Sequence, residues 1–362
     1  MRLAAHIDFV SGSRQICRLQ YWAAAKGGIA VKMSHLLEVK GLTTSFKGDF
    51  GTKSISVDHV SFHVDKGETI CIVGESGCGK SVTSLSLMRL LSRSGEVTEG
   101  SVLFDGQDLF AMTEKELDKV RGNKITMIFQ DPLTSLNPVF TVGSQIAESI
   151  RVHMNMSKED ARARAEMLLK KVGMPDAAGV MKKFPHTLSG GMRQRAMIAM
   201  ALSCDPKLLI ADEPTTALDV TIQAQIMKLL KELQQENGMS LILITHDIGL
   251  VARMADRVLV MYAGQLIEEA PVKELFKNPK HPYTEALLAS VPTIRDEADR
   301  QLFSIPGIVP EVYDDIEGCR FAGRCRYYRP ECDKKQEDYE FGPGHTAKCS
   351  VRKREEKGTG RL

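Results

Sequence analysis

Residues 69–81 read TICIVGESGCGKS, and this stretch decides the fold. Its first five residues form a compact, largely β-branched run, which predicts a buried strand. The next eight match the phosphate-binding pattern G-x-x-x-x-G-K-[ST]. Beyond the loop, apolar residues recur every three positions and indicate one face of a helix: Val82, Leu85, Met88 and Leu91. The local order is therefore strand, glycine-rich loop, helix.

The loop has the chemistry of a polyphosphate site. Glycines let the backbone curl so that its N–H groups point at an anion, and the following helix adds its positive N-terminal end. We expect Lys80 to contact the β- and γ-phosphates of ATP and the hydroxyl of Ser81 to bind Mg²⁺. The other loop residues expected to line the nucleotide are Gly74, Glu75, Ser76, Gly77, Cys78 and Gly79. The alternative, a glycine-rich turn that happens to precede a helix, does not explain the full pattern, and Cys78 is interpreted as a small side chain that a variable position tolerates.

An acidic pair follows a second predicted strand, at residues 208–211. Carboxylates at the end of a buried strand lie at the edge of a sheet. There Asp212 can hold the Mg²⁺ shell and Glu213 can polarise an attacking water. Acidic residues end many strands, but this pair follows the phosphate loop by about 130 residues, the order expected of a nucleotide hydrolase.

The wider pattern predicts an α/β fold with a largely parallel sheet. Strands are expected at 125–129, 241–245 and 258–262, with a helix at 222–235 between two strands. Residues 136–202 are mostly helical in pattern and are interpreted as a lobe inserted between strands, with a capping-box-like helix start at 157–160. The nucleotide-binding core is predicted to span residues 34–280. Residues 281–351 are proline-rich and contain cysteines, and they are predicted to form a small C-terminal domain with little regular structure. Residues 352–362 are predicted to be a solvated tail of mixed charge.

Composition restricts the class of protein. The 362 residues carry 48 Lys and Arg against 46 Asp and Glu, so the chain has no basic excess that would indicate a nucleic-acid binder. Its longest apolar runs are far shorter than the ~18 residues of a membrane-spanning helix, so action at a membrane requires partners. Residues 1–33 lack the continuous apolar segment of a signal peptide. They are interpreted as a disordered or amphipathic extension, or as the result of an upstream start codon with Met33 as the natural start.

A specific family resemblance begins at residues 188–195, LSGGMRQR. This stretch resembles the signature motif of the ABC ATPases, which other phosphate-loop enzymes do not require. Its chemistry is again anion binding, by Ser189 and the backbone of Gly190 and Gly191 ahead of a helix predicted to begin near Arg193. The fold implied is an ABC-type nucleotide-binding domain, a P-loop NTPase.

The resemblance assigns further residues in the family's order. Gln130 is similar to the glutamine that senses Mg²⁺ and the attacking water. Asp219, in Ala217-Leu218-Asp219, is similar to the D-loop aspartate, and His246 to the switch histidine that contacts the γ-phosphate. Phe46 resembles the aromatic residue that stacks on adenine, although Phe50 is close and Phe46 also suits a core position. In this family two such domains pair head to tail, which implies a second ATPase subunit.

Two more stretches resemble dipeptide and oligopeptide importer subunits. They are residues 130–138, QDPLTSLNP, and the run from 281 to 321, which includes HPYT at 281–284, ALL at 286–288, VP at 291–292, IPG at 305–307 and GCRF at 318–321. The resemblance implies Mg²⁺-dependent ATP hydrolysis that drives uptake of di- or oligopeptides, or of a related solute such as a metal chelate. It implies two membrane permease subunits, an external solute-binding protein, no nucleic acid, and a position on the cytoplasmic face of the membrane.

Four of the eight cysteines are grouped near the C-terminus: Cys319, Cys325, Cys332 and Cys349. Their spacing differs from the C-x₂-C pair of common zinc sites. In the resembling subfamily this region is associated with a [4Fe–4S] cluster, and four thiolates are the right number. Zinc, and unliganded structural cysteines, are the alternatives.

Two rival functions differ from transport. One is a soluble ABC ATPase in DNA repair or translation, but such proteins usually carry two ATPase units or long coiled-coil insertions, and neither is visible here. The other is a module that binds ATP without hydrolysing it. The presence of Glu213 and His246 argues against that module.

Overall fold

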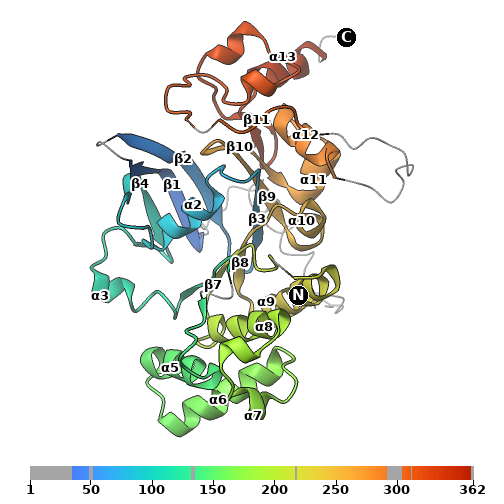
Figure 1. The fold of residues 1–362 in the computed structure, drawn as a ribbon. Helices are drawn as coiled ribbons and strands as arrows, with labels where there is room; N and C mark the ends of the chain where they lie inside the picture. The colour runs from blue at the N-terminus through green and yellow to red at the C-terminus, as the bar shows by residue number, and fades with distance from the viewer. Residues whose placement is uncertain are drawn as a thin grey trace, which may run out of the picture. The chain divides into compact units, whose positions relative to one another are not determined.

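The structure, a computed structural model, is built on a central eight-stranded sheet that carries the phosphate loop (Figure 1). It describes residues 35–48, 52–131, 135–216, 218–291, 304–310 and 312–359, and residues 35–362 group into one unit. The predicted extension at 1–33 lies outside the described residues. No helix within the described ranges is long and apolar enough to cross a membrane.

The strand order of the central sheet is β11-β12-β10-β9-β3-β8-β7-β6. The five strands from β9 to β6 are parallel to their neighbours, as the sequence predicted, and β10 to β11 continue the sheet antiparallel. The strands are β3 (Thr69–Val73), β6 (Ile125–Ile128), β7 (Leu208–Asp212), β8 (Ser240–Ile244), β9 (Arg257–Tyr262), β10 (Gln265–Pro271), β11 (Tyr339–Gly342) and β12 (His345–Ala347). Each predicted parallel strand is confirmed within one residue at either end.

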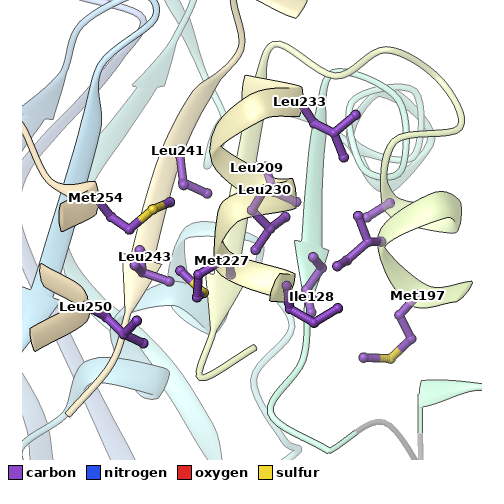
Figure 2. Close-up of a cluster of buried hydrophobic side chains, with 14 of the residues drawn as sticks. Ile128, Met197, Leu209, Met227, Leu230, Leu233, Leu241, Leu243, Leu250 and Met254 are labelled. Atoms are coloured by element: carbon purple, nitrogen blue, oxygen red, sulfur yellow. The ribbon is translucent and has the colours of Figure 1, made fainter. Parts of the chain in front are cut away.

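Side chains of the parallel strands alternate between two buried cores. In β8, Leu241 and Leu243 enter one core, and Ile242 and Ile244 enter the other. Helix α9 (Val220–Asn237) covers the first core. The helix predicted at 222–235 is thereby confirmed, and it is two residues longer at each end. Figure 2 shows its Met227, Leu230 and Leu233 directed toward side chains of the sheet. Because both faces are covered, the strands are continuous hydrophobic runs.

The second core lies against an antiparallel sheet of order β2-β1-β4-β5. Its strands are β1 (Leu37–Lys47), β2 (Lys53–Val64), β4 (Gly95–Phe104) and β5 (Gln107–Asp108). Helix α2 (Lys80–Leu87) follows the phosphate loop and contacts both β1 and β2. The helix is shorter than the predicted apolar face, since Leu91 lies beyond its end.

Helices fill the chain between β6 and β7, where residues 136–202 were predicted to be helical. They are α5 (Val142–Met154), α6 (Lys158–Lys171), α7 (Ala177–Val180), the short 3₁₀ turn η2 (Pro185–Thr187) and α8 (Gly190–Ala201). The predicted cap of α6 is present: the Ser157 side chain accepts a hydrogen bond from the Asp160 N–H. Helix α8, however, begins at Gly190 and not near Arg193. The Ser189 hydroxyl caps it, and this offsets the weak helix preference of the two glycines.

The remaining short helices connect strands. They are α3 (Glu114–Leu117), α10 (Ile248–Met254) and α11 (Val272–Lys277).

The prediction of little regular structure after residue 281 was wrong. This segment contains α12 (Pro282–Ala289), the turns η3 (Ala322–Arg324) and η4 (Pro330–Asp333), the strands β11 and β12, and α13 (Ser350–Thr359). Strand β12 pairs with β10, so the segment extends the central sheet. The solvated tail predicted from residue 352 is also corrected, because Arg352 lies in α13 and forms an ion pair with Glu285 of α12.

Candidate active site

The phosphate loop joins β3 to α2 and needs glycine at two close approaches. A Cβ atom on Gly74 would lie 2.2 Å from the Met261 carbonyl oxygen, and one on Gly79, whose φ is +98°, would lie 2.6 Å from the Ser56 carbonyl oxygen. The Lys80 ammonium donates to the carbonyl oxygens of Gly74 and Glu75, at 2.8 and 2.9 Å. Lys80 is thus held at the centre of the loop, where an anion would meet it.

Two of the three residues expected at the Mg²⁺ site, Ser81 and Asp212, are in contact, and the third, Gln130, contacts Glu213. Asp212 is the last residue of β7, and its Oδ1 accepts a hydrogen bond of 3.1 Å from the Ser81 hydroxyl at the start of α2. Burial raises the pKa of Asp212, as does the neighbouring Glu213 charge, while Ser81 and Lys80 lower it. A buried carboxylate next to a hydroxyl suits a hard, oxygen-binding cation, whose charge would favour the ionised form.

Glu213 is the centre of the polar cluster. Gln130 donates to its Oε2 at 2.9 Å, Thr216 donates to the same oxygen at 3.0 Å, and His246 Nδ1 lies 3.2 Å from Oε1. Glu213 has a φ of +44°, a left-handed conformation that is costly for a residue with a side chain and that recurs at functional sites. Segments after three neighbouring strands, β6, β7 and β8, therefore converge on one carboxylate.

The electrostatics keep Glu213 ionised. Burial alone would raise the pKa of Glu213, but hydrogen bonds from His246 and Thr216, with the charges of His246 and Lys80, outweigh it and lower the pKa. The Glu213 side chain is 15% exposed and that of His246 is 68% exposed. The carboxylate is thus fixed, and the imidazole is accessible to a ligand.

Three other predicted residues occupy structural positions. Ser189 caps α8, and Asp219 caps α9 by accepting from the Ile222 N–H at 2.9 Å. Phe46 is a half-buried residue of β1 and lies against Gly95. Its contact with adenine stays a prediction. Ala217 and Phe50 lie outside the described residues. Figure 1 shows α8 well apart from α2, so the signature is remote from the phosphate loop within the chain.

Sequence reasoning missed Thr216 and Tyr283. Thr216 follows Glu213 by three residues, the spacing at which a hydroxyl can reach back to a preceding carboxylate. Tyr283 belongs to α12 and its hydroxyl accepts from the Glu75 N–H at 2.8 Å. The short sequence spacing could have revealed Thr216, whereas 208 residues separate Tyr283 from its partner.

The structure also brings the four C-terminal cysteines together around one small cavity, which His281 and Tyr327 also line. Burial raises the pKa of Cys319 to about 12 and that of Cys349 to about 11, and it raises the pKa of Cys325. The mutual repulsion of the thiolates adds to the shifts. Such thiols stay protonated unless a positive charge is bound among them.

Comparison with known families identifies two matching regions. A profile described as "ABC transporter" matches residues 57–216, and one described as "Oligopeptide/dipeptide transporter, C-terminal region" matches residues 267–332. Among solved structures, the dimeric post-hydrolysis state of the ATP-binding cassette MJ0796 bound to ADP and Pi is 30% identical, with a TM-score of 0.59. The match covers 65% of this chain and 98% of that one.

Curated relatives extend the likeness beyond the core. The oligopeptide transport ATP-binding protein AppD of Bacillus subtilis (strain 168) is 53% identical over 321 residues, which are 88% of this chain and 97% of the relative. The oligopeptide transport ATP-binding protein OppD of the same organism is 53% identical over 82% of this chain and 83% of its own length. With this identity along nearly the whole relative, the chain belongs to the family of ATP-binding subunits of oligopeptide ABC importers.

Proposed function

We propose that this chain hydrolyses MgATP at the site around Lys80 and Glu213 and thereby drives transport of di- or oligopeptides, or of a related solute, across the cytoplasmic membrane. The observation that carries the proposal is the convergence of Gln130, Thr216 and His246 on the Glu213 carboxylate beside the phosphate loop. A module that only bound nucleotide would not need an ionised carboxylate held by three partners. The family relatives are named for oligopeptide transport, which favours transport over DNA repair or translation.

Each residue has a distinct role in the proposed reaction. Lys80 leaves its loop carbonyls and binds the β- and γ-phosphates, and the loop N–H groups surround them. Ser81 and Asp212 would hold Mg²⁺, which would neutralise part of the phosphate charge. Glu213 accepts a hydrogen bond from the attacking water and polarises it toward the γ-phosphorus.

The residues around Glu213 act by orienting it. Gln130 and Thr216 both donate to Oε2, so they leave Oε1 as the acceptor nearest His246. His246 is sufficiently exposed to contact a γ-phosphate oxygen while it stays near Glu213. Loss of the γ-phosphate then releases His246 and Gln130 together, which is a route from hydrolysis to movement.

The signature requires a partner. Ser189 and the N–H groups of Gly190 and Gly191 lie at the N-terminal end of α8, a helix that Figure 1 shows apart from α2. Head-to-tail pairing with a second ATPase subunit would place them against the partner's nucleotide. Two permeases and an external solute-binding protein complete the proposed transporter, with this subunit on the cytoplasmic face.

We assign the four cysteines to a cluster rather than to a single zinc ion. Zinc–sulfur bonds of about 2.3 Å place tetrahedral sulfurs about 3.8 Å apart. Ligands of a single ion lie close together, but among the described residues no three of these cysteines have sulfur atoms that all lie within 4.8 Å of one another. The Ser350 hydroxyl, adjacent in sequence to Cys349, is buried, has no hydrogen-bond partner within the described residues and is therefore available to donate to a cluster sulfur. Cys319, Cys325, Cys332 and Cys349 would hold a [4Fe–4S] cluster, which would anchor this segment.

Anaerobic purification tests the cluster. We expect absorbance near 400 nm and about four irons and four sulfides per chain. Both should be lost when Cys319, Cys325, Cys332 or Cys349 is replaced by Ser, and retained when the remote Cys204 is replaced. A colourless protein, or one that contains zinc alone, would refute the cluster and leave the ATPase site unaffected.

A further inference from the structure

We infer that Arg324, in the cysteine-containing C-terminal segment, is a positioning residue for ATP binding and acts through Glu75 of the phosphate loop. The inference rests on the proposed nucleotide site and concerns a residue 244 positions after Lys80 in the chain. Its basis is a direct contact between the C-terminal segment and the loop itself.

The contact is a two-pronged ion pair. Arg324 Nη1 lies 3.1 Å from Glu75 Oε1, and Nη2 lies 3.1 Å from Oε2. Parallel bonds of this kind fix the orientation of a carboxylate as well as its charge. The Arg324 side chain is only 8% exposed and that of Glu75 is 28% exposed, so water screens the pair less than it would at the surface.

Other groups prevent Arg324 from moving away. Its Nε donates to the Pro306 carbonyl oxygen at 2.7 Å, and Nη1 donates to the Tyr262 hydroxyl at 3.2 Å. The guanidinium carbon lies 5.7 Å from the ring centre of Tyr262 and 5.8 Å from that of Phe321. Together these contacts hold the guanidinium in place, so it is already ordered before any nucleotide arrives.

The same segment also holds the loop backbone. The Glu75 N–H donates to the hydroxyl of Tyr283, whose ring lies 4.7 Å from that of Tyr262 and 5.4 Å from that of Phe321. Glu75 is thereby held at both its backbone and its side chain. Its carbonyl oxygen in turn accepts from Lys80 at 2.9 Å, so the position of Glu75 affects the ammonium that binds phosphate.

The charge of Glu75 explains why the loop needs Arg324. A carboxylate next to the bound triphosphate repels it, and the paired guanidinium cancels this repulsion while keeping the loop curled. Without Arg324 the loop would retain Lys80 and its N–H groups, but it would carry an unpaired negative charge. The expected consequence is weaker ATP binding with little change in the chemical step.

A double-mutant cycle on the full-length chain tests this inference. We expect Arg324→Ala to raise the Kd for MgATP, measured by titration calorimetry, about tenfold, the change that corresponds to one charge-assisted interaction. In the assembled transporter, KM for ATP should rise by a similar factor and kcat should change less than about twofold. In a Glu75→Gln background, the same Arg324→Ala change should alter Kd less than about twofold, because the repelling charge is gone.

Controls separate a local effect from a general one. Arg329→Ala removes an exposed arginine of the same segment and should leave Kd unchanged. Among the described residues, the Arg329 side chain donates only to the carbonyl oxygen of the adjacent Tyr328. If Arg324→Ala does not fold, Arg324→Lys carries the test: it keeps the charge without the fork and should raise Kd about threefold.

Two results would overturn the inference: a Kd for the Arg324 variant within twofold of the unmodified chain, or the same tenfold loss in the Glu75→Gln background. Lys80→Ala distinguishes a failure of the proposed site from a failure of this inference. If the unmodified chain and Lys80→Ala bind MgATP equally, the nucleotide site itself is wrong. If Lys80→Ala alone abolishes binding, only the role of Arg324 is refuted.

Discussion

At the scale of single residues, the fold places Glu213 for the role that is proposed for it. It follows the last residue of a buried strand, its backbone is in a left-handed conformation, and its carboxylate receives hydrogen bonds from Gln130 and Thr216. The sequence predicted Glu213 from the acidic pair after a buried strand, and Gln130 and His246 from the family resemblance. Only the fold shows that the three side chains meet. Each contact can be removed separately, which makes the assignment testable.

Replacing Glu213 with Gln should abolish turnover while ATP still binds. Glutamine keeps the shape but cannot accept the water's proton, so kcat in the assembled transporter should fall at least about 10²-fold. The matched control is Glu232→Gln, which changes an exposed glutamate of α9 and should have no effect on kcat. Normal hydrolysis by the Glu213 variant would show that another group polarises the water.

Replacing His246 with Ala should move the acid limb of the pH–rate profile to higher pH. The His246 hydrogen bond is the strongest of the interactions that lower the pKa of Glu213, so its loss raises that pKa. The base form of Glu213 would then disappear at a higher pH as the medium is acidified. The measurement is kcat of the assembled transporter between pH 4.5 and 8. An acid limb that stays in place, with kcat merely lowered, would show that Glu213 does not control it.

At the scale of elements, the sequence predicted the parallel strands and α9 but not the strands after residue 281. The parallel strands are buried on both faces, so each is a hydrophobic run that can be read locally. By contrast, β12 has three residues, and its place in the sheet depends on pairing with β10, about 80 positions earlier. Helix α13 is rich in charge and has little apolar pattern. Such elements are determined by tertiary contacts that the local sequence does not encode.

The pairing of β10 with β12 can be tested by the free energy of unfolding. Glu268 is fully buried and accepts from the N–H groups of Lys280 and His281 and from His345 Nε2, at 2.7, 2.8 and 2.8 Å. Glu268→Gln places an amide donor among these donors and should cost about 2–4 kcal/mol of unfolding free energy.

Urea unfolding of the full-length chain measures that cost, and hydrogen exchange should show the loss of protection at β12. Glu337→Gln, on the same segment but exposed, is the control. An unchanged unfolding midpoint for the Glu268 variant would mean that this network does not hold the segment to the sheet.

At the scale of the whole molecule, the chain carries both motifs of the proposed ATP site on elements that lie apart. Lys80 follows β3 and Glu213 follows β7, two parallel strands with only β8 between them, whereas α8, which Ser189 caps, lies apart from α2 (Figure 1). Sequence order alone cannot reveal this separation, because the signature precedes Asp212 by only about 20 residues. The arrangement predicts that Ser189 serves the nucleotide of a partner subunit.

Replacing Ser189 with Asp tests that prediction. Aspartate still caps α8, but it places a negative charge where the partner's γ-phosphate is expected. ATP binding by the isolated chain should be unchanged, and turnover of the assembled transporter should fall at least about tenfold. Thr141→Asp, the same change at the cap of α5, is the control and should leave both unchanged. Loss of ATP binding in the isolated chain would place the signature at its own nucleotide.

The central claim is that MgATP hydrolysis by this chain drives peptide transport, and the most direct test is uptake of a labelled oligopeptide into vesicles that contain the assembled transporter. The account predicts uptake that requires MgATP on the side of this subunit and that stops with Lys80→Ala or Glu213→Gln, while both variant complexes still assemble. Unimpaired uptake by the Lys80 or Glu213 variant would contradict the account, as would ATP hydrolysis that proceeds without any peptide movement.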